Sequence, residues 1–343
     1  MRHLLNTLFV TSEDIYLSLD GENVVANREH TVVARYPLHT LSAILSFSYP
    51  GASPALMGAC AQRGISLSFC TPRGKFLARV TGEANGNVLL RRAQYRVADD
   101  PVQSCAVARA MVFGKVYNAR WSIERTRRDH GLRVDTGRLE AVSGQLKVLL
   151  PQLLDETDLD SLRGLEGAGA TAYFSVFEQL ILGDSTLFQF HTRSRRPPLD
   201  PVNALLSFSY SLLSHDCAWA LESVGLDSYV GFLHRDRPGR SSLALDLMEE
   251  FRPCIADRFV LTCINNRIFQ KSDFEYRENG GVFLSESGRR IFLQRWQERK
   301  KDTMTHPFLG EKVPWGLVPY LQALLLARYL RNDLDAYPPF LWK

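Results

Sequence analysis

The hydrophobic pattern of the chain changes its period near residue 95, and this change limits the folds that are possible. Before that point, short runs of β-branched and aromatic residues alternate with turn signals such as Asp20-Gly21, which is typical of strands joined by hairpins. Beyond it, apolar residues recur at helical spacing over long stretches. Strands followed by helices predict an α+β protein, with a small β-rich domain at residues 1–98 and a larger all-helical domain at residues 99–343.

Capping residues and turn signals place several elements within this pattern. One helix is expected over residues 54–63 with Gly64 as its C-cap, and a long apolar helix over 201–222 with Asp200 as its N-cap. Helical spacing predicts further helices at residues 105–128, 139–154, 169–182 and 313–330. Strands are predicted at residues 8–10, 15–19, 24–26, 31–34, 65–70 and 76–80.

The composition excludes several classes of protein. Hydrophobic residues make up 45% and charged residues 23% of the 343 residues, which is normal for a globular protein. No apolar run reaches the ~18 residues that a membrane span requires, and no signal peptide is visible at the start. The six cysteines fit no zinc spacing and are expected to be reduced and buried. These features predict a cytoplasmic chain with no membrane partner.

The positive charge is concentrated, although the net charge is only +4. Basic residues gather in four stretches, at residues 105–133, 191–196, 235–240 and 289–301. One such stretch is typical of a solvated helix face, but four together favour a phosphate backbone as partner, because each neutralised phosphate releases counterions. Phe292 and Trp296 either stack on bases or form the apolar side of an amphipathic helix. The candidate phosphate contacts are Arg195, Arg196, Arg237, Arg240, Arg299, Lys300 and Lys301.

Three carboxylates lie close together in the segment 243–253, which has helical spacing. Asp246, Glu249 and Glu250 fall opposite its apolar face, and Pro253 is expected to end it. Asp246 and Glu249 are one helical turn apart, so both side chains can point at one spot. Packed carboxylates repel each other, so the alternatives are a metal ion between them, an arginine between them, or exposure to water.

Two further residues extend this acidic pair into a candidate site. His234 follows an apolar run and precedes a polar Pro-Gly loop, so it is either a structural histidine or a ligand or general base. Glu166 stands among three glycines and three alanines, which implies a closely packed helix, and its charge needs a partner, either an arginine such as Arg163 or a metal. One imidazole with two carboxylates suits Mn²⁺ or Mg²⁺, with open positions for a phosphate oxygen.

Four sequence blocks occur in a fixed order along the chain. They are Glu166-Gly167 with Tyr173-Phe174, the stretch 195–210, Gly231 with His234 and Gly239-Arg240, and the run Asp246–Pro253. Together they resemble the CRISPR-associated integrase and endonuclease of spacer acquisition, the universal adaptation protein. The resemblance extends through nearly the whole chain. The segment DLMEEFRP is most similar to the forms found with subtype C of the type I systems.

The resemblance implies roles for particular residues. It implies three metal ligands that are also the catalytic residues, namely Glu166, His234 and Glu249. Asp246 corresponds to an acid that lies beside the site in some members of the family. Asn203 and Tyr210 belong to the long helix that supports the site. Mg²⁺ or Mn²⁺ is the implied cofactor.

The resemblance also implies a reaction and partners. The larger helical domain is expected to be catalytic, and the β domain to form most of a homodimer contact. Two such dimers would bridge a dimer of a small second adaptation protein, as a hetero-hexamer. The DNA partners are a captured foreign fragment and the CRISPR repeat. The 3′-hydroxyl of the fragment would attack a phosphodiester at the repeat in a metal-dependent transesterification, and water at the same site would cleave DNA.

Two other functions remain open from the residues alone. A non-catalytic DNA-binding scaffold would use the acids as structural ion-pair partners, so its binding would fall with salt without yielding a metal-dependent product. A metal-dependent hydrolase of a small phosphorylated substrate would need a closed pocket and would ignore charge reversal at Arg299, Lys300 and Lys301. The distributed basic stretches favour DNA over such a substrate.

Overall fold

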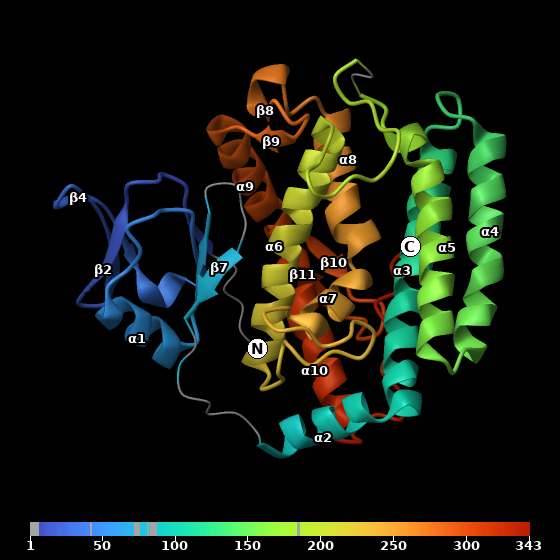
Figure 1. Ribbon diagram of the computed structural model, residues 1–343, viewed down its shortest axis with the longest axis horizontal. Coiled ribbons are helices and arrows are strands. Elements are labelled where there is room, and N and C mark those ends of the chain that lie inside the picture. The colour runs from blue at the N-terminus through green and yellow to red at the C-terminus, as the bar shows by residue number, and fades with distance from the viewer. Residues whose placement is uncertain (1–6, 42, 72–75, 81, 83–87, 184–185) are drawn as a thin grey trace. The chain divides into compact units, whose positions relative to one another are not determined.

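The computed structural model describes residues 7–41, 43–71, 76–80, 82, 88–183 and 186–343. The chain divides into two compact units. The first comprises residues 1–85, 284–304 and 314–317, and the second comprises residues 86–283, 305–313 and 318–343. Strands near the N-terminus followed mainly by helices confirm the predicted α+β class (Figure 1). The domain boundary expected at residue 98 remains a prediction, and the units divide the chain differently: α2 (Val88–Asp99) belongs to the second and α9 (Glu286–Lys301) to the first.

The first unit contains two sheets of short strands. Strands β2, β3 and β4 form an antiparallel sheet, and the other sheet has the order β1-β5-β6-β7, in which only the β6–β7 pair is antiparallel. The bounds are Thr7–Val10 (β1), Tyr16–Asp20 (β2), Asn23–Arg28 (β3), Thr31–Pro37 (β4), Ala43–Ser46 (β5), Ser66–Cys70 (β6) and Phe76–Arg79 (β7). Sequence patterning missed β5, because a strand between two parallel neighbours has no polar face and so lacks alternation.

Local chemistry explains the first helix and the first hairpin. The helix α1 (Pro54–Arg63) begins after Ser53, whose side chain accepts a hydrogen bond from the Leu56 N–H. It ends at Gly64, whose φ of 63° is the left-handed conformation of a C-cap, so both predicted bounds are confirmed. Gly21, with φ of 56°, makes the predicted turn between β2 and β3.

The second unit is mainly helical. Helices α3, α4 and α5 pack against one another, and α6 packs against α7 and α10 (Figure 1). The bounds are Pro101–Asp129 (α3), Thr136–Asp155 (α4), Leu159–Ser175 (α5), Pro201–Ser223 (α6), Ser242–Glu249 (α7), Arg258–Asn265 (α8) and Val318–Leu330 (α10). The side chain of Asp200 accepts a hydrogen bond from the backbone N–H of Asn203, which confirms the predicted N-cap of α6.

Four short strands late in the chain were not predicted. They form two sheets of two strands each, and they are β8 (Phe274–Tyr276), β9 (Val282–Leu284), β10 (Thr303–Thr305) and β11 (Lys312–Pro314). Each strand has three residues, which is too short for a period of two to be visible in sequence. The part of the chain expected to be all helical therefore also contains these small sheets.

Helices α3 and α5 approach each other closely at a glycine. A Cβ atom at Gly169 would lie 3.0 Å from Cγ2 of Val116, which is tighter than ordinary packing. The small residues around Glu166 were expected to allow such an approach, and Gly169 does so. The helix lies earlier in the chain than expected, because it begins at Leu159 rather than near residue 169 and ends at Ser175 rather than near residue 182. This approach brings the neighbours of Val116 on α3 opposite Glu166 on α5.

The prediction that Pro253 ends the helical segment is wrong. The chain continues from α7 through a π-helical turn, Arg252–Asp257, into α8. Proline has no N–H to donate to the preceding turn, so the helix widens there, and the Ala256 N–H bonds back to the Phe251 carbonyl. The last helix also differs, since it starts at Val318 rather than near residue 313.

The basic helix α9 resolves the two roles left open for its aromatic residues. Phe292 is 0% exposed and Trp296 is 2% exposed, and their rings stack with centroids 6.3 Å apart. They therefore form the buried side of an amphipathic helix and are not available to stack on bases. Within the described part of the chain, no helix is both long enough and apolar enough to cross a membrane.

Candidate active site

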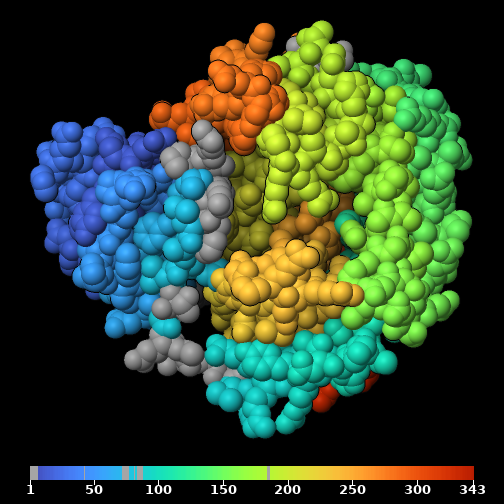
Figure 2. Space-filling view, viewed as in Figure 1, coloured from blue at the N-terminus to red at the C-terminus, as the bar shows by residue number. Residues whose placement is uncertain are grey.

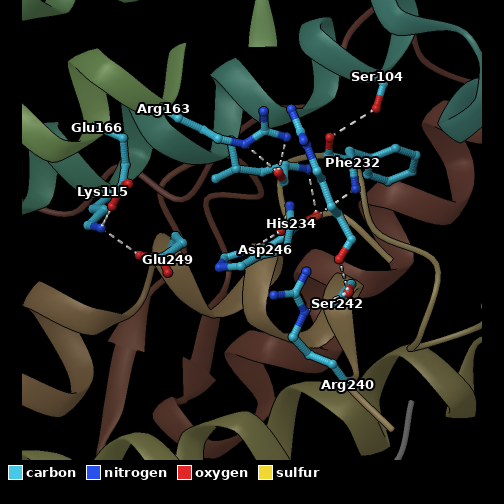
Figure 3. Close-up of polar contacts among 12 residues, drawn as sticks. Ser104, Lys115, Arg163, Glu166, Phe232, His234, Arg240, Ser242, Asp246 and Glu249 are labelled. Atoms are coloured by element: carbon cyan, nitrogen blue, oxygen red, sulfur yellow. Dashed lines mark hydrogen bonds and ion pairs between the residues drawn. The ribbon is translucent and has the colours of Figure 1, made fainter. Parts of the chain in front are cut away.

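Two glutamates from different helices meet the same lysine. Glu166 lies on α5, Glu249 is the last residue of α7, and Lys115 projects from the middle of α3 (Figure 3). The Nζ atom of Lys115 contacts Oε1 of Glu166 and lies 2.8 Å from Oε2 of Glu249. The lysine side chain is 14% exposed, so this ammonium is shared by two carboxylates in a largely buried setting.

Positive charge keeps Glu249 ionised although it is buried. Burial by itself would raise the pKa of this carboxyl group, but Arg252 and Lys115 outweigh it and lower the pKa below its ordinary value. Arg252 lies 3.0 Å from Oε1, and Lys115 approaches Oε2, so each oxygen faces a different cation. Glu249 is therefore a carboxylate at neutral pH and can bind a cation without first losing a proton.

The structure overturns the alternative in which the acids of α7 lie in water. Asp246 and Glu250 are 0% exposed and Glu249 is 3% exposed. The three carboxylates also do not share one spot, because Asp246 faces His234, Glu249 faces Lys115, and Glu250 faces the C-terminal segment. The face opposite the apolar stripe of α7 is covered by other elements, which the sequence of one helix does not reveal.

Asp246 orients His234. Its carboxylate accepts hydrogen bonds from the backbone N–H groups of Phe232 (2.6 Å), Leu233 (2.9 Å) and His234 (3.0 Å). Oδ1 of Asp246 also lies 2.6 Å from Nδ1 of His234. A carboxylate has no proton to donate, so Nδ1 carries the hydrogen and Nε2 is the nitrogen that offers a lone pair. Asp246 thus fixes the orientation of the His234 ring and leaves Nε2 as the nitrogen for a ligand.

Further contacts hold the loop that carries His234. Arg163 on α5 donates to the Leu233 carbonyl from Nε (3.0 Å) and Nη2 (2.7 Å), and the Ser104 hydroxyl donates to the Phe232 carbonyl at 3.0 Å (Figure 3). Arg163 was one of the partners considered for Glu166. It instead holds this loop and pairs with Asp160, while Lys115 pairs with Glu166.

We expect Gly231→Ala to disturb this loop. A Cβ atom at Gly231 would lie 2.8 Å from Oδ2 of Asp246 and 2.8 Å from Cβ of Ser242, so the backbone must shift. The expected loss is about 2 kcal/mol of unfolding free energy, measured by urea denaturation. Gly144→Ala is the matched control, because its Cβ would meet nothing within 4 Å on α4, and it should be neutral or slightly stabilising. If Gly231→Ala and Gly144→Ala had equal stability, Gly231 would not be in close contact with Asp246 and Ser242.

Tyr210 and Asn203, the two residues expected to support the site, have separate roles. The ring of Tyr210 lies beneath the Arg252 guanidinium, 4.5 Å from its centroid, and its hydroxyl donates to Asp257 at 2.5 Å. Tyr210 therefore supports Glu249 through Arg252. Asn203 is buried and bonds the Thr192 carbonyl at 2.8 Å, so it secures the loop before α6.

The basic residues of the second unit expected to contact DNA lie mostly at the surface. Arg195, Arg196 and Arg237 are exposed, and Arg240 is half-buried, with Nε 3.3 Å from the Ser242 hydroxyl. The loop around Arg237 is on the face shown in Figure 2, where it is coloured gold. Exposed arginines can reach a phosphate backbone, and the contact of each of these residues with DNA remains a prediction.

Helix α9 of the first unit ends with the remaining candidates, Arg299, Lys300 and Lys301. Arg299 pairs with Asp302 at 3.0 Å, and its guanidinium lies 4.8 Å from the centroid of the Trp315 ring. Arg299 is thus partly engaged in local structure, and Lys301 is exposed.

The residue types at the site are ones that bind divalent cations in proteins. The carboxylates of Glu166 and Glu249 already face one cation, the ammonium of Lys115. Two carboxylates and one imidazole are a donor set for Mg²⁺ or Mn²⁺. Among the described residues, however, no three His, Cys, Asp or Glu side chains lie close enough to form a metal cluster. The structure brings the two glutamates to one point and leaves His234 outside that point.

Lys115 and Arg252 are the site residues that sequence reasoning missed. A signal for Lys115 existed, because helical spacing placed Val112, Val116 and Ala119 on the buried face of α3, and Lys115 falls near that face. A lysine there needs an acid partner. It was counted instead as one of the basic residues of 105–133. Arg252 gave no such signal, since Pro253 was expected to end the segment.

Comparison with known proteins identifies the family. The sequence model described as "CRISPR associated protein Cas1" matches residues 8–298. The "CRISPR-associated endonuclease Cas1 2" of Rhodospirillum rubrum is 50% identical over 347 aligned positions and covers 100% of both chains. The chain belongs to the CRISPR-associated Cas1 family. The resemblance inferred from the four sequence blocks is thereby confirmed at the level of the family, whereas the subtype remains a prediction.

Solved structures show the same fold as this Cas1-family chain. A casposase bound to its integration product superposes with a TM-score of 0.83 at 23% identity and covers 98% of this chain and 94% of its own. The assembly titled "Cas6-RT-Cas1--Cas2 complex" contains a match with a TM-score of 0.79 at 22% identity, over 98% of this chain and 36% of that one. At these identities the likeness establishes the fold of the Cas1-family chain alone.

Proposed function

We propose that this chain is a metal-dependent DNA endonuclease and integrase that inserts captured foreign DNA into a CRISPR array. The observation that carries the proposal is the convergence of Glu166 and Glu249 on one cation, beside a histidine whose ring Asp246 orients. Carboxylates that together hold a metal ion are typical of phosphoryl-transfer sites. The Cas1 relative from Rhodospirillum rubrum is named an endonuclease, and the casposase neighbour is bound to an integration product, which supports this reaction class.

Each residue has a defined part in the proposed reaction. Glu166 and Glu249 would hold Mg²⁺ or Mn²⁺ through carboxylate oxygens, and His234 would contribute Nε2 as the third ligand. When bound, the ion would polarise the scissile phosphodiester and stabilise the charge that develops on its oxygens. Asp246 keeps the proton on Nδ1 of His234, so that Nε2 stays available. Arg252, supported on Tyr210, holds Glu249 in position.

The proposed chemistry is a transesterification. The 3′-oxygen of the captured fragment forms a bond to phosphorus in the CRISPR repeat, and the bond from that phosphorus to the 3′-oxygen of the repeat strand breaks. The attacking hydroxyl loses its proton and the leaving oxygen gains one. With water in place of the 3′-hydroxyl, the same site would cleave DNA. Exposed arginines such as Arg195, Arg196 and Arg237 would contact the phosphate backbone.

We also infer the assembly in which the chain acts. We expect a cytoplasmic homodimer that docks a small second adaptation protein, with two dimers and a dimer of that partner forming a hetero-hexamer. A structural neighbour occurs in an assembly that contains a Cas1 and a Cas2 component, which supports a second protein as partner. The sequence wording of the last block favours a type I subtype C system.

A strand-transfer assay tests the proposed function. Purified protein is incubated with a branched or half-site DNA substrate in Mg²⁺, in Mn²⁺ and in chelator, with and without the second adaptation protein. We expect joined or cleaved DNA only when a divalent ion is present, because the acids need that ion to act on a phosphodiester. DNA binding that falls with salt but never yields a product, even with the partner and a repeat-bearing plasmid, would indicate the scaffold function instead.

A further inference from the structure

Lys115 occupies the place between the two acidic residues of the site. Its Nζ atom contacts Oε1 of Glu166 and lies 2.8 Å from Oε2 of Glu249, as Figure 3 shows. The lysine comes from α3, a helix that contributes no residue to the expected ligand set. The ammonium therefore stands where an ion bound by both carboxylates would have to lie.

We propose that Lys115 is a built-in counterion of the metal site, which holds Glu166 and Glu249 in place without the ion and competes with the ion for them. The inference rests on the proposed function, because it takes the two glutamates as metal ligands. Lys115 is a positioning residue in this role, since it acts through the carboxylates. It sets the affinity of the site for the divalent ion.

Electrostatics explain why the site needs such a group. Glu249 is buried, and Glu166 faces the same point, so two carboxylates without a cation would repel each other in a poorly solvated place. One ammonium offsets this repulsion and keeps both side chains pointing inward. The ligands are then ordered before the ion arrives, which reduces the loss of side-chain freedom on binding.

The same contact makes Lys115 a competitor. Mg²⁺ binds oxygen at about 2.1 Å, so an ion that both carboxylates ligate has to take the position that the ammonium holds. Glu249 can exchange one cation for the other without turning, because Arg252 holds Oε1 at 3.0 Å while Lys115 pairs with Oε2. Oε2 is buried and pairs with the Lys115 ammonium at 2.8 Å, so this ion pair is what the divalent ion replaces.

Calorimetric titration with Mn²⁺ alone tests the proposal on the full chain. We expect Lys115→Met to bind Mn²⁺ about tenfold more tightly than the wild type, because the ion no longer displaces an ammonium. Lys115→Gln, which is also neutral but keeps a hydrogen-bond donor, should show the same direction. Lys147→Met, which removes an exposed lysine from α4, is the matched control and should bind as the wild type does.

Thermal unfolding supplies a second readout that does not depend on activity. In chelator, Lys115→Met should melt about 3 °C below the wild type, because the two carboxylates lose their shared counterion. Saturating Mn²⁺ should raise its melting temperature by more than it raises that of the wild type. A Lys115→Met protein that melts as the wild type does in chelator would overturn the positioning role.

Variants of the acids separate failure of this inference from failure of the proposed function. Glu166→Gln and Glu249→Gln should each weaken Mn²⁺ binding strongly if the glutamates are ligands. If they do so while the Lys115 variants bind Mn²⁺ with unchanged or weaker affinity, only the counterion role is wrong. If the wild type binds no Mn²⁺, or the acid variants bind it equally well, the metal site fails and the counterion role fails with it.

Discussion

Glu249→Ala is expected to abolish strand transfer and also to destabilise the fold. Strand transfer should fall about 1,000-fold or more, because losing a ligand carboxylate removes several kcal/mol of transition-state stabilisation. The loss of stability should be about 3 kcal/mol, since buried Arg252 would lose the carboxylate with which it pairs and Lys115 would keep only Glu166. The measurements are product formation with Mn²⁺ and urea denaturation at neutral pH.

Glu166→Ala and His234→Ala provide the comparison for this prediction. Both should abolish strand transfer to a similar extent, because each removes a proposed ligand. Glu166→Ala should cost at most about 1 kcal/mol of stability, since the Glu166 side chain is 25% exposed and Lys115 keeps Glu249 as a partner. Strand transfer at the wild-type level in any one of the three variants would remove that residue from the active site.

Glu250→Ala is expected to have the largest effect on stability without touching the proposed ligands. Oε1 of Glu250 accepts a hydrogen bond from the Tyr337 hydroxyl, and Oε2 accepts from the backbone N–H of Phe340 and from Nε2 of Gln322. These contacts attach the C-terminal segment to α7 and α10. The substitution leaves three buried donors without this acceptor, which should cost at least about 3 kcal/mol in urea denaturation.

Glu250→Gln is the matched variant for this prediction. Burial raises the pKa of Glu250 to about 8, so the group is mostly neutral at pH 7 in the folded protein, and glutamine has the shape and charge of that form. Its amide oxygen can accept from Phe340 and Gln322, while its amide nitrogen would donate to the Tyr337 oxygen. Its stability should lie within about 1 kcal/mol of the wild type. In limited proteolysis, Glu250→Ala should release the segment after residue 333 faster than Glu250→Gln does. Equal stability of the two variants would show that these hydrogen bonds contribute little.

Local signals in the sequence were sufficient for many elements of the fold. The helix over Pro54–Arg63 has a proline at its first position and a glycine directly after its end, and the structure confirms both bounds. The long helix after Asp200 is also confirmed, because it too has a capping residue and a proline at its first position. The signals failed at β5, whose pattern depends on two parallel neighbours. They also failed at Pro253, where the chain widens into a π turn instead of leaving the helix.

The candidate site was predictable in part. The family blocks pointed to Glu166, His234, Glu249 and Asp246, and the structure joins them into two pairs, Glu166 with Glu249 through Lys115, and His234 with Asp246. Lys115 lies 51 residues from Glu166, and no spacing rule relates the two positions. The partners of Glu250 lie 72 to 90 residues away, where Gln322 belongs to α10 and Tyr337 and Phe340 follow that helix, and no spacing rule relates them to Glu250.

The sequence by itself determined that strands come first and helices follow, where several helices begin and end, and, through its ordered blocks, the family of the chain. These properties depend on neighbouring residues, so they can be recognised without knowing which segments meet in space. Only the tertiary structure decided that the acids of α7 are buried, that Lys115 lies between two of the expected ligands, and that Phe292 and Trp296 belong to the core. The physical reason is that burial and charge pairing depend on which helices pack together, here on the close approach of α5 to α3 at Gly169.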